Sequence, residues 1–218
     1  MMNDLFCAWP KIPRLNREMV ITEKIDGTNA AIIIRELEPG DLHPQMITAT
    51  FTELTDENQQ PYEGLVGVFA QSRKRLITPE ADNHGFADWV KTHADTLVEG
   101  LSVGRHFGEW WGQGIQRGYG MTEKRLSLFN VHRWDSEELF DQHLVDVGLD
   151  VVPTLLVHPR FCTTRIKVAL SELQTEGSLA APGYGNPEGI VVRHQASGQL
   201  FKVTCENDDS PKELVKAA

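Results

Sequence analysis

Residues 21 to 34 read ITEKIDGTNAAIII, so a short charged segment and a glycine turn lie between two β-branched runs. Isoleucine, valine and threonine favour β-strands, because their branched side chains fit a pleated surface. Glycine followed by threonine and asparagine is typical of a turn. The stretch therefore predicts two consecutive strands, over residues 18–24 and 29–37, joined by a tight turn at Gly27.

Lys24 ends the first of these strands, with Glu23 before it and Asp26 two positions after it. A lysine at a strand end is usually a solvated charge. The alternative is a reactive amine, which must be neutral when it attacks and therefore needs a buried pocket with other cations nearby. At this point the sequence leaves both interpretations open.

Further along the chain, apolar β-branched runs recur between turn-forming residues, and three segments show helical spacing of apolar side chains. The predicted strands are residues 18–24, 29–37, 46–54, 65–72, 103–111, 125–134, 151–157, 188–194 and 199–205. The predicted helices are residues 82–99, 136–147 and 164–176, the second with a capping box of Asp135 and Glu138. Because the strands come in groups rather than alternating strictly with helices, the pattern predicts an α+β fold with antiparallel sheets.

The composition excludes several classes of protein. The chain has 218 residues and a formal net charge of -10, from 21 Lys and Arg against 31 Asp and Glu. This charge argues against non-specific coating of nucleic acid, which depends on many Lys and Arg contacts to phosphates. No apolar run approaches the ~18 residues of a membrane-spanning helix, so no membrane association is expected. Cys7, Cys162 and Cys205 follow no zinc pattern, and we expect a reducing, cytoplasmic location.

A nucleophilic lysine needs partners that hold a nucleotide: a ring for the base, an acceptor for the ribose, a carboxylate for a metal ion and cations for the phosphates. The candidates are Glu109 in FGEWWG, Phe129 in LSLFNV, Glu188 in PEGIVVR and Lys202 in LFKVT. Taken alone, Phe129 is more often a core residue, and Glu109 and Glu188 are more often surface carboxylates. Their combination with Lys24 favours the functional interpretation.

This series of motifs resembles the covalent nucleotidyltransferase superfamily of ligases and capping enzymes. The likeness is greatest to the RNA ligase 2-like branch of bacteriophage-type RNA ligases, and it runs from Glu23 to about Thr204. EKIDGTN resembles the nucleophile motif, and FGEWWGQGIQ resembles the third motif with the glycine-rich continuation of this branch. The resemblance implies two antiparallel β-sheets flanked by helices, with the nucleotide pocket between them, as in nucleotidyltransferase and ATP-grasp-like ligase folds.

The resemblance also implies a role for each candidate residue. Lys24 would be the catalytic lysine that becomes linked to AMP, Glu109 would contact the ribose, and Phe129 would stack on adenine. Glu188 would associate with the metal ion. The other implied nucleotide-binding residues are Glu23, Ile25, Asn29, Lys202 and Arg73, with Arg75 as a register alternative to Arg73.

The implied activity is that of an ATP-dependent RNA ligase-like enzyme with Mg²⁺ or Mn²⁺ as its metal. Such an enzyme forms lysyl-AMP from ATP, transfers the AMP to a 5'-phosphate RNA end, and seals that end to a 3'-hydroxyl. The setting would be a bacterial cytoplasm, or the host cytoplasm if the chain is phage-encoded. The alternatives are a DNA ligase, a capping-type nucleotidyltransferase, and a non-catalytic module that binds nucleotide or RNA ends.

The chain departs from the family pattern at two points. Thr204 stands where the last motif usually has a second lysine, so one phosphate-binding cation is missing or comes from Arg193 or Lys212. Only 14 residues follow Thr204. We therefore expect residues 1–218 to be a single adenylyltransferase domain with no appended C-terminal OB or helical domain, and a partner protein would replace the missing domain.

Overall fold

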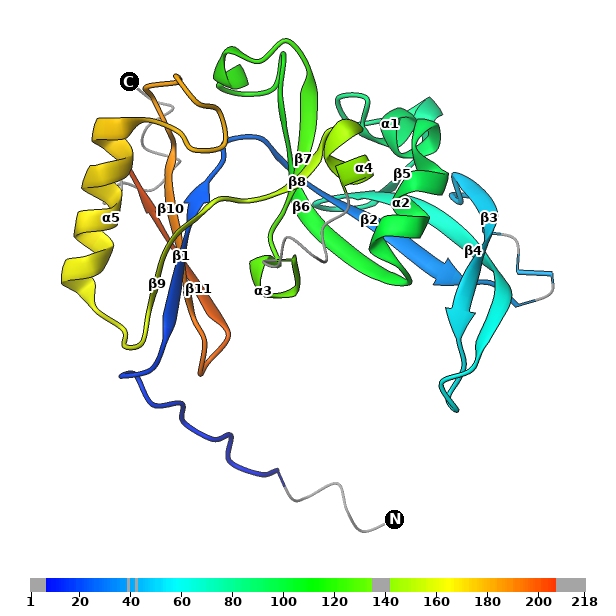
Figure 1. Ribbon diagram of the computed structural model, residues 1–218, viewed down its shortest axis with the longest axis horizontal. Helices are drawn as coiled ribbons and strands as arrows, with labels where there is room; N and C mark the ends of the chain where they lie inside the picture. The colour runs from blue at the N-terminus through cyan, green and yellow to red at the C-terminus, as the bar shows by residue number, and fades with distance from the viewer. Residues whose placement is uncertain (1–6, 39, 42, 135–141, 207–218) are drawn as a thin grey trace.

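The computed structural model describes residues 7–38, 40–41, 43–134 and 142–206 of the chain. Within these residues the strands form one four-stranded sheet and one seven-stranded sheet, which lie side by side (Figure 1). Helices flank both sheets. The predicted α+β fold of two sheets flanked by helices is confirmed.

The smaller sheet carries the strand that ends at Lys24. Its strand order is β11-β10-β1-β9, and all its described pairs are antiparallel. The bounds are β1 (Met19–Lys24), β9 (Thr154–His158), β10 (Gly189–His194) and β11 (Gln199–Thr204). Strand β10 therefore pairs with both the lysine strand and the C-terminal hairpin strand.

The larger sheet has the order β3-β4-β2-β6-β7-β8, and the short strand β5 pairs with β4. Its bounds are β2 (Thr28–Glu36), β3 (Thr48–Thr55), β4 (Pro61–Ser72), β5 (Leu76–Ile77), β6 (Gly104–Gly112), β7 (Lys124–Leu128) and β8 (Leu149–Val151). The β7–β8 pair is parallel, whereas we expected antiparallel sheets throughout. The two sheets are linked by the short turn between β1 and β2.

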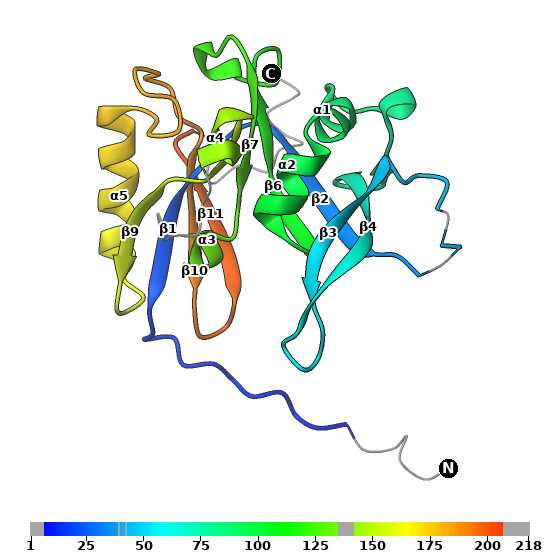
Figure 2. The same ribbon diagram turned by 45° about the vertical axis from the view of Figure 1, so that its right-hand side comes forward.

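Helices α1 and α2 pack against the larger sheet and helix α5 against the smaller sheet, on the faces that point away from the space between the sheets. The bounds of the helices are η1 (Pro79–Ala81), α1 (Phe86–Thr92), α2 (Ala94–Leu101), η2 (Gly118–Gly120), α3 (Val131–Trp134), α4 (Gln142–Asp146) and α5 (Thr163–Glu176). Helix α5 flanks the smaller sheet in both views (Figures 1 and 2), and the short helix α3 lies between the two sheets in Figure 1. None of the helices in the described ranges is long and apolar enough to cross a membrane.

Strand alternation divides the apolar side chains between separate cores. On β2, Ala30, Ile32 and Ile34 are buried in a cluster with residues of α1 and α2. On β1, Met19 and Ile21 are buried in another cluster, with Ala169 and Leu173 of α5. The opposite face of each strand is left to line the space between the sheets.

Two predicted strands are wrong in their extent. Residues 125–134 do not form one strand, because β7 ends at Leu128 and α3 follows it. Val131 and Trp134 are both buried, so their i, i+3 spacing belongs to a helix turn that continues the apolar pattern. Residues 151–157 are divided between β8 and β9, which belong to different sheets.

The division falls at Pro153, which has no N–H for a strand ladder. Its carbonyl accepts a hydrogen bond from the Glu23 N–H at 2.9 Å.

The predicted helix 82–99 is two helices that meet at His93, which has φ −111° and ψ 16°. Of the predicted helix 136–147, the part up to residue 141 and its capping box lie outside the described residues.

Gly27 is required for close approach between the turn and β6. A Cβ atom at Gly27 would lie 2.5 Å from the Trp110 carbonyl oxygen and 2.8 Å from the Trp111 Cβ. Gly27→Ala should therefore lower the free energy of unfolding by about 1–3 kcal/mol, the usual range for overpacking. Thermal melting measures this, with Gly185→Ala as control because its Cβ would meet open space. Equal melting temperatures for the two variants would contradict the prediction.

Candidate active site

A cavity of about 670 Å³ lies between the two sheets. Most of the lining residues on a strand lie at alternate positions, because every second side chain of a strand faces the same way. The residues that follow this alternation are Val20, Thr22 and Lys24 on β1 and Arg105, Phe107 and Glu109 on β6, while Glu23 and His106 also border the cavity. The nucleotide pocket predicted between the sheets therefore has a matching cavity, with Lys24 and Glu109 on opposite walls.

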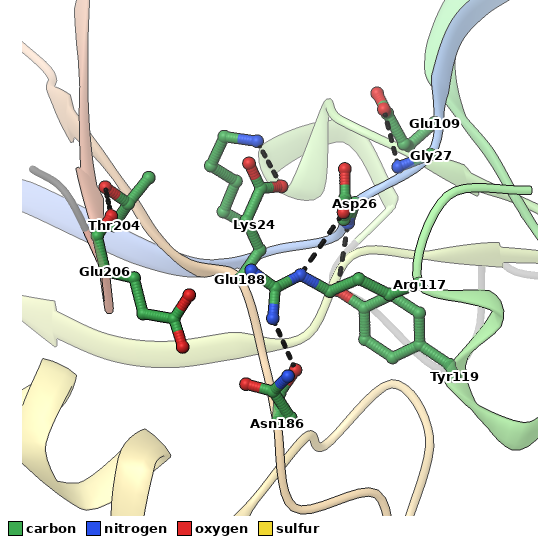
Figure 3. Close-up of polar contacts among 10 residues, drawn as sticks. All are labelled: Lys24, Asp26, Gly27, Glu109, Arg117, Tyr119, Asn186, Glu188, Thr204 and Glu206. Atoms are coloured by element: carbon green, nitrogen blue, oxygen red, sulfur yellow. Dashed lines mark hydrogen bonds and ion pairs between the residues drawn. The ribbon is translucent and has the colours of Figure 1, made fainter. Parts of the chain in front are cut away.

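Lys24 forms an ion pair with Glu188. Lys24 is the last residue of β1 and pairs with Gly189, the first residue of β10, so the register places Glu188 beside it. The two side chains are 22% and 12% exposed, respectively. Lys24 is thus a largely buried, paired amine rather than a solvated surface charge, and the structure joins two of the predicted site residues directly (Figure 3).

Glu109 is the most perturbed carboxyl group of the cavity. It lies opposite Asn29 in the β2–β6 pair, and one of its oxygens accepts a hydrogen bond from the Gly27 N–H at 3.2 Å. Burial raises the pKa of Glu109 to about 7, although Lys24 and the Gly27 N–H oppose this shift. The nearby charges of Glu188 and Asp26 add to it. Glu109 can therefore accept hydrogen bonds or carry a proton near neutral pH.

Phe129 is placed as an aromatic wall of the cavity and not as a core residue. It is 41% exposed and lines the cavity directly after β7, where its N–H donates to the Phe107 carbonyl at 2.9 Å. Asn29 also lines the cavity, and Ile25 does so from a buried position. Of the two interpretations of Phe129, the exposure favours a platform on which a flat ligand can stack.

Glu23 faces away from Lys24, because adjacent side chains of a strand point to opposite faces. Its carboxylate accepts hydrogen bonds from the Ser178 hydroxyl at 2.6 Å and from the N–H groups of Leu179 and Ala180 at 2.8 and 2.9 Å. Glu23 is 1% exposed. A nucleotide contact by Glu23, which is among the cavity-lining residues, would therefore come from its backbone.

Arg73 and Lys202, two of the predicted phosphate ligands, do not line the cavity. Arg73 is exposed in the turn between β4 and β5, and so is its register alternative Arg75. Lys202 is exposed on β11, but it pairs with Val191 and so shares the sheet face that lines the cavity. The structure thus brings together Lys24, Glu109, Phe129, Asn29 and Glu188, and it leaves these cations outside.

Sequence reasoning missed the roles of three neighbours of Lys24. The Asp26 N–H donates to the Tyr119 hydroxyl at 2.9 Å, and the Asp26 carboxylate accepts from Arg117 Nε at 3.2 Å (Figure 3). Burial raises the pKa of Tyr119. Asp26 was visible beside Lys24, but Arg117 and Tyr119 lie more than 90 positions along the chain. No local pattern connects residues at that separation.

The fold places a lysine at a cavity between two sheets, which is the arrangement that the resemblance to covalent nucleotidyltransferases predicts. The RNA ligase family profile matches residues 17–204, and the chain belongs to this family. The comparison with curated proteins gives no match.

Solved structures of Naegleria gruberi RNA ligase variants share the fold. An apo lysine-to-alanine variant has a TM-score of 0.50 at 17% identity, covering 92% of this chain and 51% of its own. A glutamate-to-alanine variant with ATP and Mn has a TM-score of 0.51 at 15% identity, covering 93% and 52%. A lysine-to-methionine variant with AMP and Mn has a TM-score of 0.50 at 17% identity, with the same coverage. The chain spans about half the length of these proteins.

The raised pKa of Glu109 predicts a pH-dependent stability. The Glu109 carboxyl group binds its proton more tightly in the native state than in the unfolded chain, where its pKa is 4.5. Protonated Glu109 therefore contributes its full stabilisation to the folded state below pH 4.5, and this stabilisation is lost as the pH rises through about 7. Compared with Glu109→Gln, the wild type should therefore lose up to about 3 kcal/mol between pH 5 and pH 8.

Thermal melting of both proteins across this pH range measures the difference. Glu172→Gln is the control, because it removes the same charge from an exposed position on α5. A difference between the wild type and Glu109→Gln that stays constant from pH 5 to pH 8 would contradict the assigned burial of Glu109.

Proposed function

We propose that this chain is the adenylyltransferase domain of an ATP-dependent RNA ligase. Lys24 attacks the α-phosphate of ATP and forms lysyl-AMP, the AMP passes to a 5'-phosphate RNA end, and a 3'-hydroxyl displaces it to seal the strand. The observation that carries the proposal is the partly buried Lys24–Glu188 pair at a cavity that is also lined by Glu109 and Phe129. Membership of the RNA ligase family supports RNA over DNA as the substrate.

The first step needs a neutral Lys24 amine. In the structure the ammonium group donates to Glu188, so a proton must pass from the ammonium to the Glu188 carboxylate before the nitrogen can attack phosphorus. As the new P–N bond forms, the bond to pyrophosphate breaks and negative charge accumulates on the leaving oxygens. Fixed donors and cations are the usual means by which a protein stabilises such charge.

The donor set fits a hard divalent cation. Glu188, Glu109 and Asp26 supply carboxylate oxygens, which Mg²⁺ and Mn²⁺ prefer. Within the described part of the chain, no three side chains of the usual ligating types lie close enough to hold a metal ion alone. Glu188 would therefore hold it together with phosphate oxygens of the nucleotide, as is common for Mg²⁺. When bound, the ion would neutralise phosphate charge.

The remaining residues would seat the nucleotide. Phe129 would stack on adenine, and Glu109 with its neighbour Asn29 would bind the ribose hydroxyls. Arg73 and Lys202 are exposed outside the cavity wall, so their contacts with the phosphates would form only in the nucleotide-bound arrangement. The ATP, AMP and Mn of the Naegleria structures are consistent with this assignment.

The proposal extends to the surroundings of the enzyme. Cys7, Cys162 and Cys205 are free thiols, which fits a reducing cytoplasm. Residues 1–218 would act as one nucleotidyltransferase domain in RNA repair, and a partner protein would help to orient the 5'-phosphate and 3'-hydroxyl ends.

Lys24 should become covalently linked to AMP. Incubation of the wild type with ATP and Mg²⁺ or Mn²⁺ should add one AMP to the intact protein, as measured by mass spectrometry. Lys24→Ala should add none, and Lys24→Arg, which keeps the positive charge beside Glu188, should also add none. An unmodified wild type at varied pH and metal concentration would refute the proposed function, and an adduct with GTP alone would indicate capping chemistry.

Phe129→Ala should weaken nucleotide binding more than folding. A ring that is 41% exposed should cost less stability than the about 3–5 kcal/mol typical of a buried phenylalanine. Its loss as a base platform should remove about 1–3 kcal/mol of nucleotide binding. Thermal melting with and without ATP separates the two effects. A large fall in melting temperature with unchanged stabilisation by ATP would show that Phe129 is a core residue and not a platform for the base.

A further inference from the structure

We propose that Arg117 is a positioning residue that holds together the two chain segments carrying Lys24 and Glu188, without contacting the nucleotide. The inference rests on the proposed adenylyl transfer, because it gives Arg117 a part in the orientation of its nucleophile. Arg117 lies outside the set of residues that line the cavity, and its side chain is 21% exposed.

Arg117 is presented by a loop with two fixed apolar points. Ile115 is 0% exposed and packs in the core beneath the larger sheet, whereas Tyr119 is 2% exposed and packs in a cluster with Ile25 between the sheets. Gly118, with a φ of 64°, allows the chain to turn sharply between these points. The start of the Arg117 side chain is therefore fixed on both sides.

The guanidinium group of Arg117 bridges two segments. Its Nε donates to the Asp26 carboxylate at 3.2 Å, and its Nη1 donates to the Asn186 carbonyl at 3.2 Å. Tyr119 of the same loop accepts the Asp26 N–H at 2.9 Å. Figure 3 shows the Arg117 side chain between Asp26 and Asn186. One loop thus holds both the backbone and the side chain of Asp26.

These contacts lie where the strand ladder ends. The last pair of the β1–β10 ladder is Lys24 with Gly189, so no ladder hydrogen bond joins the segments beyond it. Asp26 comes two residues after Lys24, and Asn186 comes two residues before Glu188. Arg117 joins the segments at this point and so limits the motion of Lys24 relative to Glu188.

An arginine suits this position better than a lysine. Its planar fork presents several donors and can serve a carboxylate and a carbonyl together, whereas a lysine ammonium is a compact point charge. The positive charge of Arg117 also offsets the negative charge of Asp26. The charges of Asp26 and Glu188 both raise the pKa of Glu109, so the three carboxylates lie close enough to repel one another. Without Arg117, the repulsion among these carboxylates would favour displacement of the Asp26 turn.

The first test needs no ligand and compares Arg117→Gln with the wild type. Backbone hydrogen exchange should become about tenfold faster in residues 25–28 and 188–190, as expected for loss of hydrogen bonds to a charged group. Arg35→Gln is the matched control, because Arg35 forms an ion pair with Asp41 at an exposed position away from the cavity. Unchanged exchange in both segments would overturn the proposal.

The second test measures single-turnover AMP transfer to Lys24. Arg117→Gln should lower the rate constant at saturating ATP by about 10- to 100-fold, the scale expected for a misplaced reacting group. The ATP concentration that gives half of this rate should stay within about twofold, because Arg117 does not contact the nucleotide. Arg117→Lys should rescue only part of the rate.

The two tests separate the inference from the proposed function. A loss of ATP affinity at an unchanged maximal rate would make Arg117 a nucleotide ligand and overturn the positioning role. A wild type that forms no adduct would refute the proposed function, and the hydrogen exchange would still decide whether Arg117 holds the two segments.

Discussion

The antiparallel pairing of β1 with β10 is the constraint on which the site depends. Its register sets Lys24 against Gly189, so Glu188 lies beside the amine, and the strand alternation sends Lys24 to the cavity and Glu23 to the opposite face. A shift of this register by one residue would turn Lys24 away from the cavity and Glu23 toward it. The hydrogen bonds from Ser178 and the following N–H groups to Glu23 stabilise the correct register from the far side.

The charge balance around Lys24 explains why a metal ion belongs in the proposed reaction. Glu188 pairs with the amine, the charges of Glu188 and Asp26 both act on Glu109, and burial already raises the pKa of Glu109 to about 7. A nucleotide triphosphate adds further negative charge to this acidic environment. Binding therefore requires compensation, which a divalent cation between carboxylate and phosphate oxygens would supply in addition to the arginines that line the cavity, Arg105, Arg133 and Arg193.

The sequence predicted those parts of the fold and site that depend on local patterns. Lys24, Glu109 and Phe129 each lie in a short apolar run, and their strands bring them to one cavity. The junction at Pro153 was missed because a continuous apolar pattern does not show that its two halves pair in different sheets. Arg117 was missed for a similar reason, because its partners are far away along the chain and only the three-dimensional pairing brings them together.

The position of Thr204 in the sheet indicates which nearby cation would replace the second lysine of the family's last motif. Thr204 pairs with Gly189, next to the Lys24–Glu188 pair, and its hydroxyl donates to the Glu206 carbonyl at 2.9 Å. Arg193 is four residues from Gly189 along β10, about 13 Å at the rise of a strand, and it lines the cavity. Lys212 lies outside the described residues. Lys202 is two residues from Thr204 on the same strand face and is therefore the nearer cation from which compensation for Thr204 would come, and Arg193 is the more distant one.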